Sequence, residues 1–298
     1  ILMMTNLIPN RMHRLFPCLS DQHKWTSTYE LSLLHSSNDR VMTGVPLIEQ
    51  TEISPDTKIS TYARTKKIPK EHFFFMIWRY TSYDDGPLTF HFPPNSNNTD
   101  FAFMTEFTIK CFQWMSNSSG TNVPIFPMMN IAPVSNSLIM DYYTIPGVTL
   151  VKKQRVLFNA EESSTNDKLE LITTITRAVA SQWIGILIYP KSYSDFWIYR
   201  ALAHYVADFM MEAMEPTFRI RESFLARTIL WTRCDRDLDA STTIPFYLFD
   251  TWDDKMYFRR DDYLGYQAMT LIAMIHEIYD FEDIGSLLKH ALMRWCVD

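Results

Sequence analysis

The spacing of hydrophobic residues makes the first part of the chain rich in predicted strands. Trp25–Leu34 mixes apolar, aromatic and β-branched residues at strand length. Phe73–Tyr80 is a nearly continuous apolar run, which is typical of a strand buried on both faces. Leu88–Phe92 is a third stretch of strand character. We therefore expect a β-rich portion before about residue 93.

From about residue 100 the hydrophobic period changes from that of a strand to that of a helix. Phe101–Met115 is a predicted helix, and Ser163–Asn166 supplies the side-chain oxygens that begin a longer one. Within the longer helix, apolar residues recur at intervals of three and four, which predicts a buried stripe. Further helices are predicted from Ser194 to about Met214 and over 217–231, 261–279 and 283–296.

The turn sequence Asp84–Pro87 separates these two parts of the chain. We accordingly predict an α+β protein with two domains: the remainder of a β-domain at residues 1–85, and a mainly helical domain with a small sheet at 86–298. A length of 298 residues is sufficient for both.

Composition and charge exclude several classes of protein. Apolar residues make up 47% and charged residues 21%, which is globular rather than disordered composition. A net charge of −6 lacks the basic footprint of a nucleic-acid-binding protein. The chain has only 7 glycines and contains no glycine-rich phosphate loop or nucleophile elbow. The 4 cysteines show no C-x-x-C spacing, and no apolar run is long enough to span a membrane.

The segment from Met140 to Tyr205 contains a recognisable series of short motifs. They are Met140-Asp141 with Ile145-Pro146, Val156-Leu157-Phe158, Glu162-Ser163-Ser164, Asn166-Asp167-Lys168, Gln182-Trp183-Ile184-Gly185 and Ser194-Asp195-Phe196-Trp197. In this series the chain resembles the zinc aminopeptidases of the aminopeptidase-N type, a gluzincin metallopeptidase family. Leu15–Cys18 is similar to a motif of that family's N-terminal β-domain. The resemblance implies a thermolysin-like fold for the second domain and makes the chain a truncated member.

The resemblance also implies where a zinc site would stand. The family uses H-E-x-x-H and a later Glu, because two His at i and i+4 share one helix face and can bind one zinc ion. Counted onto this sequence, the two His positions hold Arg177 and Ser181, the general base is Ala178, and the Glu ligand is Arg200. Zinc is the family's cofactor, and these replacements predict that it is absent here.

Two other family elements differ in this sequence. Ile145-Pro146 continues almost directly into Gly147, so that the loop of about ten residues that grips a peptide's α-amine is missing. The Tyr that steadies the tetrahedral intermediate falls on Leu264, and Tyr263 or Tyr266 reaches that place only with a shift of register. The catalytic residues and the substrate-binding loop that the resemblance implies are therefore replaced or missing in this sequence.

Arg177 and Arg200 suggest a new use for the same region. Planar guanidinium groups suit carboxylates, so Arg177, Arg200 and the neighbouring His204 are candidates for an anion or peptide cleft. In the competing interpretation each arginine is paired within the protein, for example with Glu170 or Asp195, or points to solvent.

Other residues that could bind a metal or take part in catalysis have simpler structural explanations. His276, Glu277 and Asp280 resemble a damaged metal motif without a third ligand on a helix that already has an apolar stripe. The remaining candidates are a loop cluster at Asp235, Asp237 and Asp239, an apolar Cys18, and core or partner-binding methionines at Met210, Met211 and Met214.

We therefore expect a catalytically inactive aminopeptidase-like protein that binds a peptide or a protein partner, and not nucleic acid. The alternatives are a zinc aminopeptidase with a rebuilt site, and a structural subunit of a larger assembly. The resemblance implies a secreted or membrane-associated context, although the chain shows neither a signal peptide nor a membrane span. The missing family domains would leave apolar surface bare, which favours a partner or a longer chain.

Overall fold

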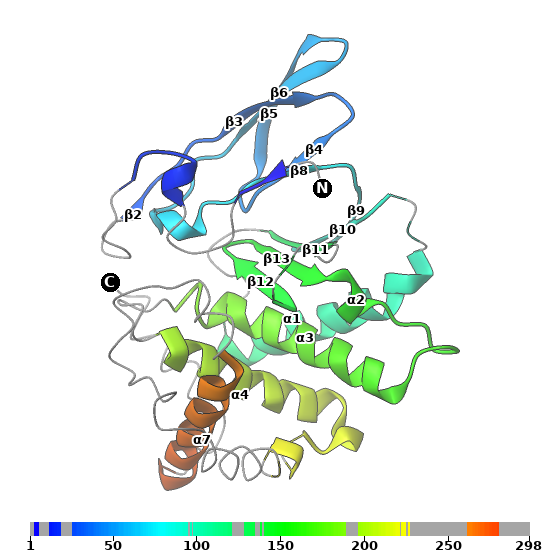
Figure 1. The fold of residues 1–298 in the computed structure, drawn as a ribbon, viewed down its shortest axis with the longest axis vertical. Helices are drawn as coiled ribbons and strands as arrows, with labels where there is room; N and C mark the ends of the chain where they lie inside the picture. The colour runs from blue at the N-terminus through cyan, green and yellow to red at the C-terminus, as the bar shows by residue number, and fades with distance from the viewer. Residues whose placement is uncertain are drawn as a thin grey trace.

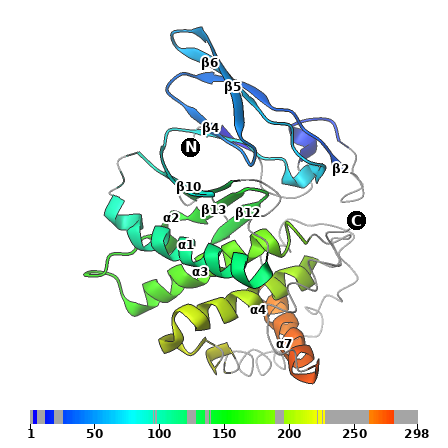
Figure 2. The same cartoon turned by 180° about the vertical axis from the view of Figure 1, so that it is seen from behind.

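A computed structural model describes residues 3–5, 12–18, 26–94, 96, 98–120, 128–134, 138, 140–188, 196–220, 222–224, 226 and 261–279. Small antiparallel sheets come first in the chain, and a mixed sheet with helices on one face follows (Figures 1 and 2). The fold is therefore mixed α+β, as the hydrophobic pattern predicted. The division into two domains at residue 85 remains a prediction.

The N-terminal part consists of short strands in three sheets. Their orders are β1-β8-β4, β2-β7 and β3-β6-β5, and all pairs are antiparallel. The strands are β1 (Met3–Met4), β2 (Thr26–Ser27), β3 (Ser32–Ser36), β4 (Arg40–Met42), β5 (Leu47–Ser54), β6 (Thr57–Tyr62), β7 (Ile68–Pro69) and β8 (Met76–Trp78), with 3₁₀ turns at Met12–Arg14 and Lys70–His72.

Two strands predicted in this part of the chain do not extend as far as the sequence indicated. The stretch 25–34 contains β2 and the start of β3, because the chain changes pairing partner from β7 to β6 between them. The apolar run 73–80 contains only β8. Its first residue, Phe73, instead packs against Tyr29 with ring centroids 4.9 Å apart, and this aromatic packing explains the hydrophobicity without a strand.

The second part is built on a five-stranded sheet in the order β12-β13-β11-β10-β9. Strands β10, β11 and β13 run parallel, and the outer strands β12 and β9 are antiparallel to their neighbours. The bounds are β9 (Thr81–Asp85), β10 (Leu88–Phe92), β11 (Met129–Val134), β12 (Tyr142–Ile145) and β13 (Val148–Lys152). The turn at 84–87 joins β9 and β10 as a hairpin of this sheet.

The helices lie on one face of this sheet, and the N-terminal strands lie on the other (Figure 1). They are α1 (Ala102–Ser119), α2 (Lys153–Val156), α3 (Thr165–Trp183), α4 (Phe196–Met214) and α7 (Asp261–Tyr279), with 3₁₀ turns at Asn98–Phe101 and Pro216–Phe218. The predicted helices at 101–115, after 163–166, at 194–214 and at 261–279 are thus confirmed. The stretch 283–296 lies outside the described residues, as do 221, 225 and 227–231. Of the rest of 217–231, residues 217 and 218 belong to the second 3₁₀ turn, and 220, 222–224 and 226 are helical.

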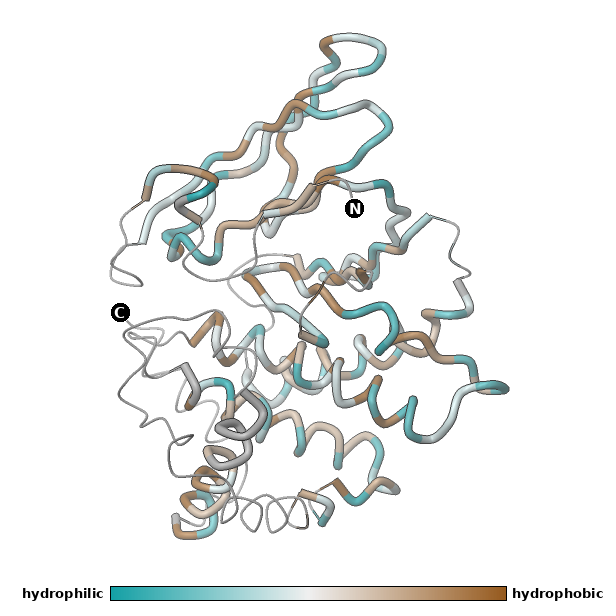
Figure 3. Tube along the Cα trace, viewed as in Figure 1, coloured by the Kyte–Doolittle hydropathy of each residue, from teal (hydrophilic) through white to brown (hydrophobic). Residues whose placement is uncertain are grey.

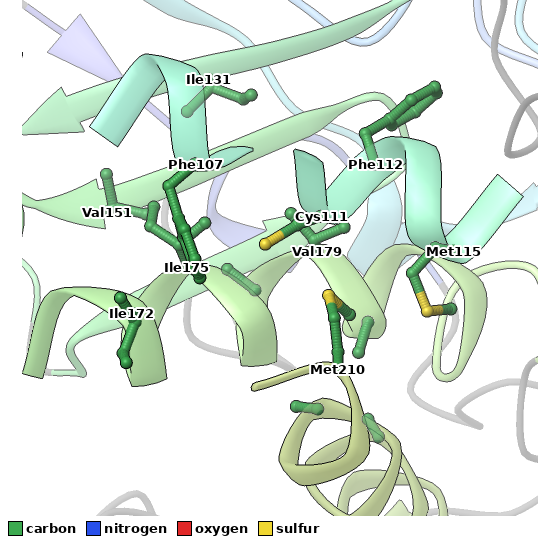
Figure 4. Close-up of a cluster of buried hydrophobic side chains, with 14 of the residues drawn as sticks. Phe107, Cys111, Phe112, Met115, Ile131, Val151, Ile172, Ile175, Val179 and Met210 are labelled. Atoms are coloured by element: carbon green, nitrogen blue, oxygen red, sulfur yellow. The ribbon is translucent and has the colours of Figure 1, made fainter. Parts of the chain in front are cut away.

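Local sequence explains where α3 begins. Ser164 and Asp167 form a capping box, in which each side chain accepts a hydrogen bond from the other residue's backbone N–H, at 3.2 and 2.7 Å. From there Ile172, Ile175 and Val179 face the core with at most 1% of each exposed. Figure 4 shows these residues of α3 beneath Cys111 and Met115 of α1, with Met210 of α4 on the other side.

The main core therefore lies between the sheet and the helices, and Met210 and Met211 belong to it, so of the two alternatives for these methionines the core is correct. A second apolar cluster lies on the opposite face of the sheet, where Val148 and Leu150 meet Met42 and Trp78. Figure 3 shows hydrophobic residues distributed through both parts. At the same boundary a Cβ on Gly44 would lie 2.0 Å from the carbonyl oxygen of Pro146, so only glycine permits this approach.

Candidate functional site

The candidate site lies where α3 and α4 meet the edge strand β12. Tyr142 lies on β12, Arg177, Ala178 and Ser181 lie on α3, and Arg200 and His204 lie on α4. We call this group the arginine site. Its three elements come from separate parts of the sequence, and the contacts described below hold them together.

A partly buried hydrogen-bonded pair joins β12 to α4. Tyr142 Oη and His204 Nε2 share a hydrogen bond of 2.9 Å, and His204 is only 7% exposed. Burial lowers the pKa of His204 well below its usual range, and the charges of Arg177 and Arg200 lower it further. His204 is therefore a neutral imidazole at physiological pH.

The lowering of the His204 pKa by both arginines also indicates where the two arginines lie. Coulombic energy falls with distance, so both guanidinium groups must lie near the imidazole to act on it. The Nε atoms of Arg177 and Arg200 are themselves buried. Arg177 on α3 and Arg200 on α4 thus both lie within electrostatic range of His204, and the shared cleft expected from the sequence remains a prediction.

Polar contacts fix α3 against the hairpin formed by β12 and β13. Thr144 Oγ1 donates to the carbonyl oxygen of Ala178 at 3.4 Å. Gln182, which is fully buried, donates from Nε2 to the carbonyl oxygens of Ile145 and Val148 at 3.1 and 3.2 Å, and contacts Thr149 Oγ1 at 3.0 Å. Gln182 belongs to one of the short motifs that resemble the family, and in the structure it anchors α3 to the β12–β13 hairpin.

The hairpin connection itself is short. Ile145 pairs with Val148, so Pro146 and Gly147 form the whole turn, and Gly147 has a positive φ of 72°. A two-residue turn of this kind requires a residue that tolerates positive φ at its second position, which glycine does.

The side chains at the arginine site do not fit a zinc ion. Zinc in proteins takes imidazole nitrogen, thiolate or carboxylate ligands. A guanidinium group has no lone pair to offer, and alanine has no donor atom. Ser181 uses its hydroxyl to donate to the carbonyl oxygen of Arg177 at 2.7 Å. Within the described ranges, no group of three or more His, Cys, Asp or Glu is arranged to hold a metal.

Other candidates from the sequence have separate surroundings. Glu170 pairs with Arg155 rather than with Arg177. His276 Nδ1 shares a hydrogen bond of 2.8 Å with Tyr205 Oη, and its ring stacks on Phe209. Cys18 is half-buried, and Cys111 is fully buried.

The remaining candidates cannot be placed. Asp195, Asp280 and the cluster Asp235, Asp237 and Asp239 lie outside the described residues, as do the side chains of Tyr263, Leu264 and Tyr266. No helix in the described part of the chain is long and apolar enough to cross a membrane.

Comparison with known proteins identifies the class of protein to which this fold and site belong. The model of the peptidase family M1 domain matches residues 103–292, which include strands β11 to β13, nearly all of α1, and helices α2, α3, α4 and α7. The chain therefore belongs to peptidase family M1, and the resemblance to aminopeptidase N stated above is confirmed.

The curated relatives are distant aminopeptidases. Glutamyl aminopeptidase of Bos taurus is 19% identical over 242 residues, which are 79% of this chain and 25% of the relative. Endoplasmic reticulum aminopeptidase 1 of Homo sapiens is 20% identical over 76% of this chain and 24% of its own length. Aminopeptidase N of Rattus norvegicus is 22% identical over 70% of this chain and 22% of its own length. The chain thus spans about a quarter of the length of these relatives.

Proposed function

We propose that this chain is a catalytically inactive aminopeptidase-like protein, a pseudo-peptidase, that binds peptides or a protein partner through the arginine site. The observation that carries the proposal is that Arg177 on α3 and Arg200 on α4, each with a buried Nε, occupy positions counted for the family's zinc ligands on the helix pair that also holds the buried His204. The positions counted for the family's zinc ligands thus present two positive charges. A divalent ion beside two guanidinium groups is repelled by several kcal/mol at an effective dielectric constant of about 20.

The chemistry of the site favours an anionic ligand. Arginine forms two parallel hydrogen bonds with a carboxylate, which gives both affinity and orientation. An acidic side chain or a C-terminal carboxylate of a peptide supplies that group. His204 adds no charge, because its imidazole is neutral, and Tyr142 holds the ring in place.

Catalysis is tested by metal analysis together with cleavage of aminoacyl reporters. The alternative function is a zinc-dependent aminopeptidase that releases N-terminal residues, and membership of family M1 favours it. We expect substoichiometric zinc and no chelator-sensitive turnover of leucyl, alanyl or glutamyl reporters. Stoichiometric zinc with turnover that a chelator abolishes would overturn the proposal.

Binding is tested separately by fluorescence anisotropy with labelled acidic peptides. The matched pair is one peptide with a free C-terminal carboxylate and the same peptide amidated. We expect the double variant Arg177→Gln, Arg200→Gln to lose affinity for the free form, while Arg64→Gln, an exposed arginine paired with Glu30, retains it. Equal affinity of the double variant and the unchanged protein contradicts a peptide role for the site.

A third possibility is a structural subunit whose partner does not use the arginine site. Capture of partners from the native tissue, with the double variant as the comparison, separates this possibility from peptide binding. A partner retained equally by both forms indicates assembly, whereas a partner lost with the arginines indicates recognition at the site.

A further inference from the structure

A cavity of about 620 Å³ lies between the N-terminal strands and the outer face of the five-stranded sheet. Its lining residues come from β4 on one wall and from the β9–β10 hairpin on the floor. Its volume falls within the range of roughly 300–1,000 Å³ that is usual for small-molecule sites. It is distinct from the arginine site, since none of that site's residues lines it.

The cavity exists because this face of the sheet changes from apolar to polar. Near β13 the face is apolar and packs against the N-terminal strands. On β9, β10 and β11 the same face carries polar side chains in two cross-strand rows, since Thr89 pairs with both Asp84 and Asn130, and His91 pairs with Ser82. Polar side chains offer no apolar surface against which the N-terminal strands could pack, so the two layers stay apart there.

The opposing wall carries two positive charges. Arg40 of β4 and Lys58 of β6 both line the cavity. Arg40 donates to Ser82 Oγ at 3.3 Å and lies 5.9 Å from the centre of the Tyr80 ring. In the part of the chain that the structure describes, neither cation forms an ion pair with a carboxylate. Asp84 is the one acidic residue among the lining residues, and its Oδ1 accepts from Thr89 at 2.8 Å.

The floor holds a buried acceptor without a partner. Asn130 donates from Nδ2 to the carbonyl oxygens of Thr43 and Gly147, so its Oδ1 must accept from His91 Nε2 at 2.8 Å. In the neutral ring this leaves Nδ1 of His91 as a lone-pair acceptor, and Nδ1 is buried with no hydrogen-bond partner among the described residues. Desolvation lowers the pKa of His91 to about 4, so the ring stays neutral.

We propose that this cavity binds a small organic anion that carries hydroxyl groups. Its acid group, a carboxylate or a phosphate, lies on the wall of Arg40 and Lys58, and its hydroxyls donate to Asp84 on the floor. A neutral sugar lacks the first contact and a simple inorganic anion lacks the second, so both parts of the ligand are required.

The test is isothermal titration calorimetry on the full chain with four probes: glucuronate, glucose 6-phosphate, glucose and inorganic phosphate. We expect at least one of the two sugar anions to bind, and glucose and inorganic phosphate to bind at least about tenfold more weakly. Tighter binding of glucuronate identifies a carboxylate ligand, and tighter binding of glucose 6-phosphate identifies a phosphate ligand. Failure of both sugar anions at millimolar concentration, or equal binding of inorganic phosphate, overturns the proposal.

The matched variants are Arg40→Gln with Lys58→Gln, and Lys66→Gln as the control. Lys66 is exposed in the same part of the chain and does not line the cavity. We expect the double variant to raise the dissociation constant by about tenfold or more and the control to leave it unchanged. An equal affinity in all three proteins contradicts the assignment of the acid group to this wall.

Discussion

Tyr142 and His204 are 62 positions apart in the sequence, yet their side chains share a partly buried hydrogen bond of 2.9 Å. This contact joins the edge strand β12 to helix α4 at the point where Arg177 and Arg200 also converge. A neutral imidazole held by a phenol, with two guanidinium groups nearby, is suited to holding an anion. This arrangement is consistent with the proposal that the site binds an anion.

The first prediction concerns the charge at the arginine site. Replacing Arg177 and Arg200 by Gln removes two charges that lower the pKa of His204, so we expect that pKa to rise. It stays below 6.5 because burial, the larger cause, remains. NMR titration of the His204 ring measures the change, with Arg64→Gln as the control. An unaltered titration would show that the guanidinium groups do not face the ring.

The second prediction tests the correspondence with the family's zinc positions. The triple variant Arg177→His, Ser181→His, Arg200→Glu supplies three zinc ligands if α3 and α4 hold these positions at the family's spacing. We expect zinc to raise its melting temperature in a concentration-dependent way. The variant Arg177→Gln, Arg200→Gln should show no such rise. If zinc does not raise the melting temperature of the triple variant either, positions 177, 181 and 200 do not correspond to the family's zinc ligands.

The third prediction concerns Gln182. Gln182→Met keeps the side-chain volume but removes the contacts of Nε2 with Ile145, Val148 and Thr149. Buried carbonyls left without a donor make the folded state less stable, here by about 2 kcal/mol or more. Urea unfolding measures the loss, and Gln113→Met on the exposed side of α1 is the matched control. Equal midpoints for the two variants contradict the anchoring role.

The fourth prediction concerns stability in acid. The pKa of His91 is about 4 in the folded protein and near 6.5 when the chain is unfolded, mainly because of burial. Between these values the unfolded chain binds the proton and the folded one does not, so stability falls as pH drops below 6.5. The loss reaches about 2 kcal/mol by pH 5.

The variant His91→Gln isolates this effect, because glutamine can still donate to Asn130 but does not titrate. We expect its free energy of unfolding to change about 2 kcal/mol less between pH 7 and pH 5 than that of the unchanged protein. Denaturant unfolding at the two pH values measures the difference. An identical pH dependence in both proteins would show that His91 is not held neutral by the fold.

The sequence by itself predicted the features that depend on nearby residues. The start of α3 follows from the capping chemistry of Ser164 and Asp167, three positions apart, and the bounds of α7 follow from its own period. Arg177 with Ser181, and Arg200 with His204, are each four residues apart on one helix, so each pair was expected to share a helix face. These relations are local, and helix geometry fixes them without tertiary contacts.

Only the tertiary structure decided which distant residues meet. The strand limits within 25–34 and 73–80 depend on pairing partners elsewhere, and the approach of Gly44 to Pro146 depends on how two layers pack. The bond between Tyr142 and His204, and the cavity above His91, likewise join segments that the chain keeps far apart. Local periodicity determines which face of an element is buried, whereas the packing of whole layers determines what that face touches.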